Sequence, residues 1–415
     1  MKVVVYTLGC KVNQYESDGL IYGLKQLGYE VSTEIEYADI YILNSCAVTN
    51  EAEKKSRQTI AKFKACNNNA KIIVCGCASQ KNSNQFSNIA NITLIKGTAN
   101  KQAIVDKINS VGQEIDELSL EYEKDYIVSP SKTRAHIKIQ DGCNNFCSYC
   151  IIPYLRGRSR SRNLDSILKE IEFLSKCVKE IVITGIDITD YKINGQKAIT
   201  QLIEQLKQYN DVRFRLGSLE QGIIDEEFVK AVKNSNVCPH FHLSLQSGCD
   251  ATLKRMNRKY TTKQFLDSVN YIKNNFENAC ITTDVIVGFP EESDEEFKQT
   301  CQFVQECGFY NMHIFPYSVR SGTVAEKMKQ VDGSVKRERA KVLADINRKL
   351  NKNYIEKCLG KRFSVLIEEF DGEYYIGHTE NYLKCYIKEE CTLNTFVSIK
   401  ILKQYKDGVL AQKEN

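Results

Sequence analysis

Short hydrophobic runs separated by amphipathic segments predict strands that alternate with helices over the first part of the chain. The runs are rich in β-branched residues and lie at 2–8, 39–45, 71–76 and 92–97. Between the first two, the leucine and isoleucine residues of ESDGLIYGLKQLG fall on one helical face, and Gly28 stands where a helix C-cap is expected. A basic helix is expected over 50–64. Because parallel strands need crossover helices, we expect a doubly wound parallel α/β domain over residues 1–115.

A second series of strand-like runs follows, again separated by helical patterns. The six runs lie at 135–140, 180–185, 213–218, 240–246, 282–289 and 312–318. Six units are fewer than the eight of a closed barrel, so we expect an open, partial (β/α)6 barrel over residues 133–354. The residues between the two series, 113–132, are polar and acidic and have no period. We interpret 116–132 as a linker.

The pattern changes again near the end of the chain. After a basic helix over 335–353, five short runs of alternating hydrophobicity are separated by Asp-Gly, Gly and Asn. This spacing is typical of a small antiparallel β-barrel, which we expect over residues 355–415.

Composition narrows the class of protein. A chain of 415 residues is long enough for two or three domains. No apolar run is long enough to cross a membrane, and the opening MKVVVYTLGC lacks the pattern of a signal peptide, so we expect a cytoplasmic protein with no membrane partner. In such a compartment the clusters among the 17 cysteines indicate metal or redox chemistry rather than disulfides. The formal net charge of +5 permits nucleic-acid binding without requiring it.

The most specific motif is GCNNFCSYC, in which Cys143, Cys147 and Cys150 have Cys-x3-Cys-x2-Cys spacing. Three thiolates so close together can hold three corners of a [4Fe–4S] cluster, and no fourth cysteine is near. One iron would then keep an open coordination site. A structural zinc site is the alternative, but it would need a second pair of ligands that the neighbouring sequence lacks.

Polar and glycine-rich residues end several of the predicted barrel strands, where the active sites of such barrels gather. We expect the cofactor and substrate to be lined by some of Gly185, Asp187, Ser218, Glu220 and Gln246. Polar residues are also ordinary at strand ends, so each of these alone is a weak signal.

Three further cysteines follow the first three predicted strands. These are Cys10, Cys46 and Cys77, and in a doubly wound sheet they converge on the carboxyl edge, where ligands bind. They can hold a second cluster, again with three ligands, or they are unconnected loop cysteines. Cys75 could compete with Cys77, because residues two apart on a strand point to the same face. We prefer Cys77, which lies beyond the strand.

Many segments resemble the motifs of the radical SAM methylthiotransferases. The Cys-x3-Cys-x2-Cys spacing resembles the signature of the radical SAM superfamily, and TLGCKVNQYES, LNSCAVTNEAEKKSR and VCGCASQ resemble the three cysteine motifs of the methylthiotransferases. The resemblance continues through CIIPYLRGRSRSR, EIVITGIDITDY, HFHLSLQSGCDATLKRMNRKYT, TTDVIVGFPEESDEEF and IFPYSVRSGT, and the tail resembles a TRAM domain. One departure is Ser79, where the third motif of the family usually has alanine.

The resemblance implies two [4Fe–4S] clusters and S-adenosylmethionine as cofactors. Cys10, Cys46 and Cys77 would hold the cluster that carries the inserted sulfur, and Cys143, Cys147 and Cys150 the cluster that cleaves S-adenosylmethionine. The radical formed there would abstract hydrogen from the substrate carbon, which then takes up the methylthio group. An external electron donor and a sulfur source are further implied.

The opening TLGCKVNQYES resembles most the branch of the family that acts on C2 of N6-threonylcarbamoyladenosine at position 37 of tRNA. The alternatives are isopentenyladenosine in tRNA and an aspartate of a ribosomal protein. Basic residues that could contact RNA phosphates are Arg156, Arg158, Arg160, Arg162, Lys336, Arg337, Arg339, Lys341, Arg348, Lys349 and Lys352. The stretch 356–415 has nine Lys/Arg and ten Asp/Glu, which suits a basic ribosomal protein better than RNA.

A hypothesis of another class is a non-catalytic iron–sulfur protein that carries electrons or binds RNA. It requires fully ligated clusters, and the missing fourth cysteines argue against it. We assign no role to the five histidines.

Overall fold

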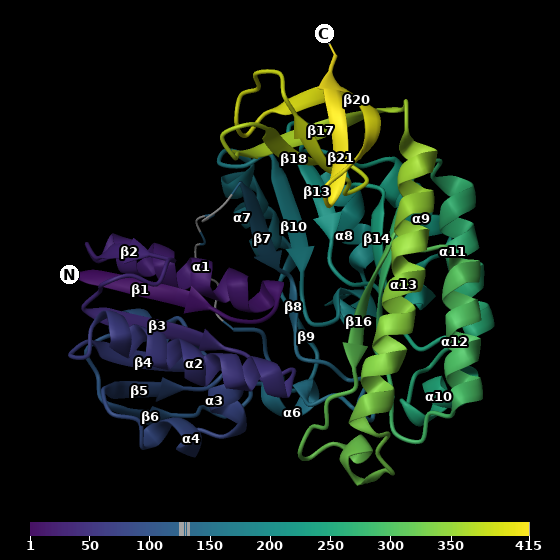
Figure 1. The fold of residues 1–415 in the computed structure, drawn as a ribbon. Coiled ribbons are helices and arrows are strands. Elements are labelled where there is room, and N and C mark those ends of the chain that lie inside the picture. The colour runs from purple at the N-terminus through teal and green to yellow at the C-terminus, as the bar shows by residue number, and fades with distance from the viewer. Residues whose placement is uncertain (124–127, 129, 131–132, 415) are drawn as a thin grey trace. The chain divides into compact units, whose positions relative to one another are not determined.

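The amino-terminal part of the computed structural model is a six-stranded parallel sheet with the order β2-β1-β3-β4-β5-β6. Its strands are β1 (Lys2–Thr7), β2 (Glu30–Ser32), β3 (Ile40–Ser45), β4 (Lys71–Gly76), β5 (Ile92–Lys96) and β6 (Gly112–Glu114). The helices between them are α1 (Lys11–Gln26), α2 (Asn50–Cys66), α3 (Cys77–Lys81), α4 (Asn84–Ser87) and α5 (Ala103–Asp106), and they cover both faces (Figure 1). The predicted doubly wound domain is thereby confirmed.

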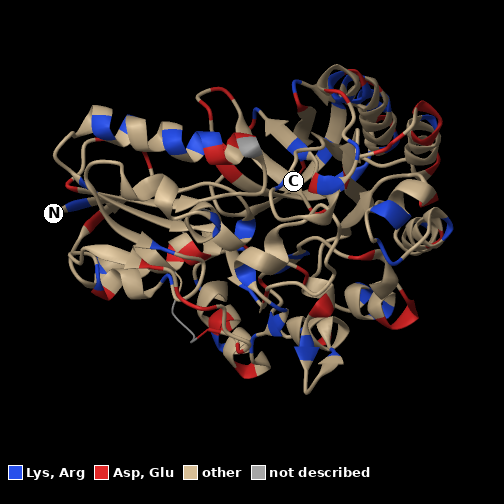
Figure 2. Ribbon diagram, turned by 90° about the horizontal axis from the view of Figure 1, so that it is seen from below, with Lys and Arg blue, Asp and Glu red and all other residues tan. Residues whose placement is uncertain are grey.

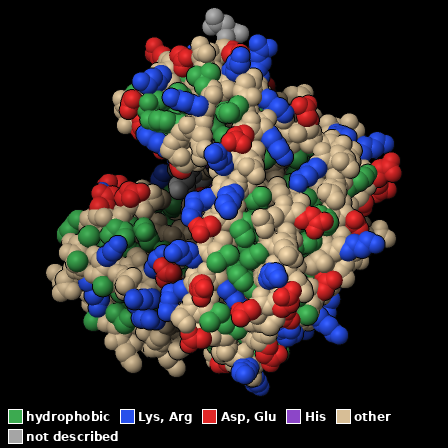
Figure 3. Space-filling model, turned by 45° about the vertical axis from the view of Figure 1, so that its right-hand side comes forward, with side chains coloured by type: hydrophobic (Ala, Val, Ile, Leu, Met, Phe, Trp, Pro, Cys, Tyr) green, Lys and Arg blue, Asp and Glu red, His purple; other side chains and the backbone are tan. Residues whose placement is uncertain are grey.

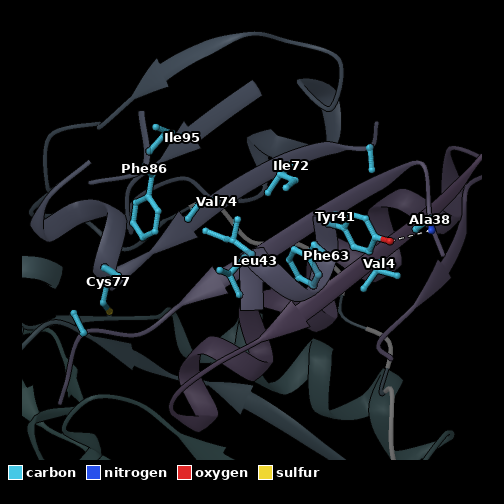
Figure 4. Packing of buried hydrophobic residues seen from close by; sticks show 14 of the residues in the cluster. Val4, Ala38, Tyr41, Leu43, Phe63, Ile72, Val74, Cys77, Phe86 and Ile95 are labelled. Carbon is cyan, nitrogen blue, oxygen red and sulfur yellow. Dashed lines mark hydrogen bonds between the residues drawn. The ribbon is translucent and has the colours of Figure 1, made fainter. Parts of the chain in front are cut away.

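Alternation along the strands explains the two helical layers. Val3 and Val5 pack with Leu20 of α1 in one buried cluster, whereas Val4 packs with Phe63 of α2 in the other (Figure 4). The aromatic ring of Phe63 stacks on Tyr41 with the centroids 4.5 Å apart. Each face of the sheet is therefore sealed by its own helices, which is what fixes the strand register.

The structure describes residues 1–123, 128, 130 and 133–414, and these fall into two compact units. The first unit comprises Met1–Leu174, Ile183–Lys197 and Ser318–Glu326. The second comprises Ser175–Val182, Ala198–Tyr317 and Lys327–Asn415. Part of the predicted linker 116–132 lies outside the described residues. In its described part, Asp116 forms an ion pair with Lys96 at 2.8 Å, and the Tyr122 hydroxyl donates to the Lys138 carbonyl.

The six strands predicted for the middle of the chain are all present. They are β7 (Arg134–Lys138), β10 (Glu180–Thr184), β13 (Arg213–Leu216), β14 (His240–Gln246), β15 (Cys280–Val287) and β16 (Asn311–Pro316). Backbone hydrogen bonds join neighbouring strands within each unit. In the first unit the Ile139 amide, just after β7, donates to the Thr184 carbonyl at the end of β10. In the second unit the Arg213 amide of β13 donates to the Lys179 carbonyl just before β10. Also in the second unit, β14, β15 and β16 form a parallel sheet.

The elements that connect these strands are helical or short. In the first unit they are β8 (Gln140–Asp141), α6 (Ile152–Arg156), β9 (Arg160–Ser161), α7 (Leu164–Ser175, whose last residue opens the second unit), η1 (Ile188–Asp190), β11 (Lys192–Ile193) and β12 (Gln196–Lys197). In the second they are α8 (Ile199–Leu206), η2 (Gln221–Ile223), α9 (Glu226–Lys233), α10 (Asp250–Arg255), α11 (Thr262–Asn275), α12 (Asp294–Cys307) and α13 (Gly333–Cys358), with η3 (Val324–Lys327) at a boundary between units. Capping boxes begin α11 and α12.

The carboxyl-terminal strands close into a barrel with the order β17-β18-β19-β21-β20. They are β17 (Arg362–Phe370), β18 (Tyr375–Thr379), β19 (Lys384–Ile387), β20 (Phe396–Tyr405) and β21 (Gly408–Lys413). The prediction of a small barrel is confirmed, with one pair, β19 and β21, running parallel. A closed ring with an odd number of strands cannot be antiparallel throughout, so one parallel pair is required.

Charged residues of both signs are interspersed along the ribbon and on the face in the space-filling view (Figure 2, Figure 3). Among the described residues, no helix combines the length and hydrophobicity of a transmembrane span.

Candidate functional site

Three cysteines lie at the carboxyl edge of the amino-terminal sheet. Cys10 stands at the N-cap of α1, Cys46 follows β3 directly, and Cys77 is the first residue of α3. The winding of the sheet reverses between β1 and β3, which is the position where doubly wound sheets bind ligands. The strand order therefore brings these three loops to one place.

Two glycines allow the loops to approach closely. Gly9 has a φ of 106°, and a Cβ there would lie 2.9 Å from Cys46 Cβ. Gly76 has a φ of 102°, and a Cβ there would lie 2.5 Å from the Ser45 carbonyl oxygen. Any side chain at either position would force the cysteine loops apart, so these glycines shape the cradle.

The three thiols also interact electrostatically. Burial, with smaller contributions from Cys77 and Cys10, raises the pKa of Cys46 to about 11. Burial likewise raises the pKa of Cys77, where Cys10 adds to the effect and Arg156 and Lys101 oppose it. Such thiols become thiolates only with compensation from a positive group or a metal, as the ligands of a metal centre require.

The structure separates Cys75 from Cys77. Cys75 is fully buried in the hydrophobic cluster that faces α1, with its pKa raised to about 12 by burial. Cys77 belongs to the cluster on the other face (Figure 4). The strand ends at Gly76, so alternation no longer applies at residue 77. Cys77 is therefore the cysteine at the edge of the sheet, and we keep it as the expected ligand.

The second cysteine loop follows β8 in the same unit. Cys143, Cys147 and Cys150 are each partly exposed, and the Cys150 amide donates to the Cys147 carbonyl at 2.9 Å. Burial raises the pKa of Cys143 to about 12, with Asp187, Cys150 and Cys147 contributing. The three cysteines thus lie in one partly exposed loop, consistent with a cluster that keeps one corner open.

Gln140 and Asp187 hold this loop. The Gln140 side chain donates to the Gly142 carbonyl at 2.8 Å and accepts from the Asp187 amide at 2.8 Å. The Asp187 carboxylate accepts from Asn145 Nδ2 at 3.0 Å. A Cβ on Gly185 would lie 3.0 Å from the Gln140 carbonyl oxygen. The structure therefore brings Gly185 and Asp187 to the cysteine loop, although only Asp187 contacts it directly.

Among the described residues, no three His, Cys, Asp or Glu side chains are placed to hold a single metal ion. A [4Fe–4S] cluster makes a different demand, because each thiolate binds its own iron and the ligands stand further apart. Two sets of three interacting cysteines, with glycines at close approach in one of them, fit such clusters better than a zinc ion.

The other three expected cofactor contacts belong to the second unit. Glu220 Oε2 accepts from Arg258 Nη2 at 2.5 Å, and the same nitrogen donates to the Ser244 carbonyl at 3.1 Å. Gln246 ends β14 with a φ of 68°, and Ser218 is exposed. They lie at the ends of neighbouring strands, since the Leu219 and Leu243 backbones form a bridge.

Sequence reasoning missed a polar cluster on the open face of the β14-β15-β16 sheet. His242 Nε2 lies 3.2 Å from Asp284 Oδ2, and His313 Nδ1 lies 3.8 Å from Asp284 Oδ1. The three strands follow one another in the chain, but helices separate them and the sequence does not give their register. The register of the parallel pairs, with Asp284 opposite His313, brings the side chains together.

Three of the arginines expected to contact RNA phosphates are buried instead. Arg156, Arg160 and Arg162 are each less than one-tenth exposed and pair with carboxylates of the first unit. A buried cation is stable only next to an anion, and these arginines are paired with buried carboxylates. The prediction that they contact RNA phosphates is therefore wrong for these three residues. Arg158 is exposed, with its guanidinium 4.4 Å from the centre of the Phe146 ring.

The basic stretch of α13 is mostly exposed, as expected. Arg339 is the exception, because it is buried and pairs with Glu292 at 2.7 Å. Lys336 is half-buried against Tyr317. The exposed members are Arg337, Lys341, Arg348, Lys349 and Lys352.

Comparison with known families matches two parts of the chain. Residues 137–304 match the model of the radical SAM superfamily, and residues 2–97 match that of the uncharacterized protein family UPF0004. The second match contains Cys10, Cys46 and Cys77, and the first contains the Cys-x3-Cys-x2-Cys loop.

Curated relatives match over almost the whole chain. The threonylcarbamoyladenosine tRNA methylthiotransferase MtaB of Chlamydia pneumoniae is 37% identical over 98% of this chain and 96% of its own, and that of Bacillus subtilis is 36% identical over 98% and 95%. The ribosomal protein uS12 methylthiotransferase RimO of Clostridioides difficile is 33% identical over 97% and 96%. The tRNA-2-methylthio-N(6)-dimethylallyladenosine synthase of Natranaerobius thermophilus is 34% identical over 84% and 82%.

Among solved structures, the radical S-adenosylmethionine methyltransferase TsrM of Kitasatospora setae is similar with a TM-score of 0.57. It is 13% identical and covers 78% of this chain and 77% of its own. At that identity the likeness shows a shared fold.

Proposed function

Because the chain belongs to the family of radical SAM methylthiotransferases, we propose that it adds a methylthio group to C2 of N6-threonylcarbamoyladenosine at position 37 of tRNA. The observation that carries this proposal is the pair of cysteine triads, each at the carboxyl ends of strands within one unit. A methylthiotransferase needs one centre to hold sulfur and another to generate a radical.

We assign Cys10, Cys46 and Cys77 to one [4Fe–4S] cluster and Cys143, Cys147 and Cys150 to the other. When bound, the first would supply the sulfur that is methylated and the second the electron that cleaves S-adenosylmethionine. The chain's own part is to leave one corner of each centre free of a cysteine. The partial exposure of the second loop supports this assignment.

Residues beside the second loop are proposed to bind S-adenosylmethionine. Asp187 is fixed by the Asn145 amide and by the Thr189 amide nitrogen, 3.2 Å from its Oδ1. Its carboxylate can accept a hydrogen bond from an amino or hydroxyl group. Gly185 leaves room there. In the second unit, considered by itself, Ser218, Glu220 and Gln246 stay the proposed cofactor contacts.

The choice of substrate rests on the relatives. Those named for threonylcarbamoyladenosine tRNA are 35–38% identical, whereas those named for uS12 or dimethylallyladenosine are 33–34% identical. Dimethylallyladenosine in tRNA and the ribosomal protein stand as the alternative substrates. An external electron donor and a sulfur source are required in either case, and we place the reaction in the cytoplasm.

The carboxyl-terminal barrel, our proposed TRAM-like substrate-binding domain over 355–415, has one feature suited to RNA. Lys406 Nζ lies 5.1–5.2 Å from the ring centres of Tyr374, Tyr386 and Tyr405. Lysines held beside aromatic rings combine phosphate attraction with apolar contact. This local grouping supports RNA binding despite the nearly neutral charge of the tail.

The test is a competition between substrates. Anaerobically reconstituted protein with S-adenosylmethionine and a chemical reductant is offered tRNA with threonylcarbamoyladenosine, tRNA with dimethylallyladenosine, and ribosomal protein uS12. We expect methylthiolation of the first alone, detected by mass spectrometry. Modification of uS12 or of dimethylallyladenosine instead would overturn the substrate assignment.

A further inference from the structure

One carboxylate joins three segments of the first unit. Glu53 lies on α2, the helix that follows the Cys46 loop, and its side chain is 16% exposed. Its Oε1 accepts from Lys81 Nζ at 2.7 Å and from Arg320 Nη1 at 3.1 Å. A single acceptor atom therefore connects α2 with two segments that are distant in the chain.

Lys81 extends this connection to a second cysteine of the amino-terminal set. It is the last residue of α3, whose first residue is Cys77. The ion pair between Glu53 and Lys81 therefore holds together the two helices that lie next to Cys46 and Cys77.

Arg320 belongs to segment 318–326, and its side chain is 2% exposed. Its carbonyl accepts from the Thr323 hydroxyl at 2.7 Å, and its Nη2 donates to the Ser318 hydroxyl at 3.2 Å. These contacts hold the turn from which the guanidinium reaches Glu53.

The same segment also contacts the second cysteine loop. The Ala325 amide donates to the Ser148 carbonyl at 2.8 Å, and both residues are buried. Ser148 lies between Cys147 and Cys150. A buried backbone hydrogen bond is costly to leave unmade, so the loop and the segment stay together. The segment therefore contacts α2 near its start and the second cysteine loop near its end.

These contacts form a continuous connection between the two cysteine sets. It runs from α2 and α3 through Glu53 and Arg320 to the loop that carries the second set. The side chains of both ion pairs are at most 20% exposed, so salt screens them little.

We propose that Glu53 is a positioning residue that, through Lys81 and Arg320, fixes the two cysteine sets relative to one another and so sets how efficiently the substrate takes up the methylthio group. The inference rests on the proposed function, which assigns one cluster to each set and requires both to serve the same substrate atom. Because hydrogen is removed at one centre and sulfur is supplied at the other, their relative placement matters. Displacing a reacting group by about 1 Å can cost about a hundredfold in rate.

The experiment compares two products of one reaction. Reconstituted protein is given S-adenosylmethionine, a chemical reductant and whichever of the three candidate substrates the natural chain modifies, and 5′-deoxyadenosine and the methylthio product are measured by mass spectrometry. Glu53→Gln, Arg320→Gln and Lys81→Gln should each lower the methylthio product formed per 5′-deoxyadenosine, the first two by at least about tenfold. Formation of 5′-deoxyadenosine should stay near that of the natural chain, because these variants keep the second cysteine loop.

A second readout needs no iron. In the iron-free protein, hydrogen–deuterium exchange of peptides that cover 318–326 and 143–150 should be faster in Glu53→Gln and Arg320→Gln than in the natural chain. The reason is that the ion pair to α2 restrains the segment that contacts the loop.

The control is a carboxylate on the same helix. Glu51 pairs with Lys55 on the surface, so Glu51→Gln should leave both the product ratio and the exchange unchanged. Arg320→Lys keeps the charge and should stay closer to the natural chain than Arg320→Gln. The double variant with Glu53→Gln and Arg320→Gln should be no worse than the poorer single variant, because both changes break one contact.

Three results would overturn the inference. An unchanged product ratio in Glu53→Gln and Arg320→Gln would show that the connection does not position the centres. A proportional loss of both products would assign the pair to stability alone. A lower ratio without faster exchange would contradict the route through segment 318–326.

Failure of the proposed function would look different. The natural chain itself would then form no methylthio product with any of the three substrates, and the inference would fall with it.

Discussion

Arg156 and Glu16, which are 140 residues apart in the chain, are joined by two hydrogen bonds, Nη1 to Oε1 at 2.9 Å and Nη2 to Oε2 at 3.2 Å. Arg156 ends α6, six residues after Cys150, and Glu16 lies on α1, six residues after Cys10. The pair therefore connects the segments that carry the two cysteine sets. Both side chains are at most 2% exposed, so the connection is fixed within the core of the first unit.

Removing Arg156 should destabilise the first unit. Arg156→Ala leaves Glu16 and Asp141 buried with fewer partners, and breaking such a pair costs about 3–5 kcal/mol. The first thermal or denaturant transition of the iron-free protein should occur earlier by a corresponding amount. Arg348→Ala, which breaks an exposed pair with Asp345, should cost less than about 1 kcal/mol. Equal effects of the two substitutions would show that the buried pair is not structurally important.

The stability of the iron-free protein should fall in mild acid. Buried cations, Arg156 and Lys138 among them, hold the pKa of Glu16 and of Asp141 below their ordinary values despite burial. Their stabilising contribution is therefore complete above the pKa of the unfolded chain and is lost as pH falls toward the folded values, because the unfolded state takes up protons first. Unfolding followed by circular dichroism from about pH 6 to about pH 3 should show this loss.

Glu16→Gln provides the control for the pH dependence. It removes one of the two buried carboxylates and leaves surface carboxylates such as Glu36 unchanged, so stability should fall less steeply with acid than in the natural chain. Identical slopes for the two proteins would contradict the linkage to Glu16.

Iron content should distinguish Cys77 from Cys75. Two [4Fe–4S] clusters hold about eight irons, and Cys10→Ala, Cys77→Ala and Cys143→Ala should each remove about half. Cys75→Ala should keep the full amount, because Cys75 lies in the hydrophobic cluster beneath α1. Loss of iron from Cys75→Ala with retention in Cys77→Ala would reverse the assignment.

The fold could be predicted from local sequence because its signals are local. Most strands of the first sheet are short apolar runs. Val3 and Val5 belong to one buried cluster and Val4 to the other, as the two-residue repeat of a strand predicts. Gly28 follows the C-cap of α1 with a positive φ, as expected. The helix begins earlier than predicted, at Lys11, since Cys10 is its N-cap and its polar first turn shows no apolar period.

The buried ion pairs of three arginines could not be predicted in the same way. Arg156, Arg160 and Arg162 lie in a segment of alternating basic residues that has the pattern of an exposed phosphate-binding strand. Their carboxylate partners are Glu16 on α1, Asp141 just before the second cysteine loop, and Glu170 on α7. Burial of charge depends on which distant segments meet, and one sequence carries no sign of that pairing. The grouping of His242, Asp284 and His313 escaped prediction because the sequence does not give the register of β14, β15 and β16.

Asp187 should affect the cleavage of S-adenosylmethionine without affecting iron. Asp187→Ala removes the acceptor for Asn145 and a proposed cofactor contact, and a hydrogen bond to a charged group is worth about 1.5–3 kcal/mol. Formation of 5′-deoxyadenosine should therefore fall roughly ten- to hundredfold, while the iron content stays the same. Asp190→Ala is the control, because Asp190 lies three residues away and pairs with Lys192 instead. Equal losses in both variants would argue against a specific role.

The central claim, methylthiolation of threonylcarbamoyladenosine in tRNA, is tested most directly by mass spectrometry of nucleosides from the tRNA of a strain that lacks this protein. We predict that the methylthio form of threonylcarbamoyladenosine is absent, that its precursor accumulates, and that the natural chain restores it whereas Cys46→Ala does not. Unchanged nucleosides in the strain would contradict the claim and favour the ribosomal protein as the substrate.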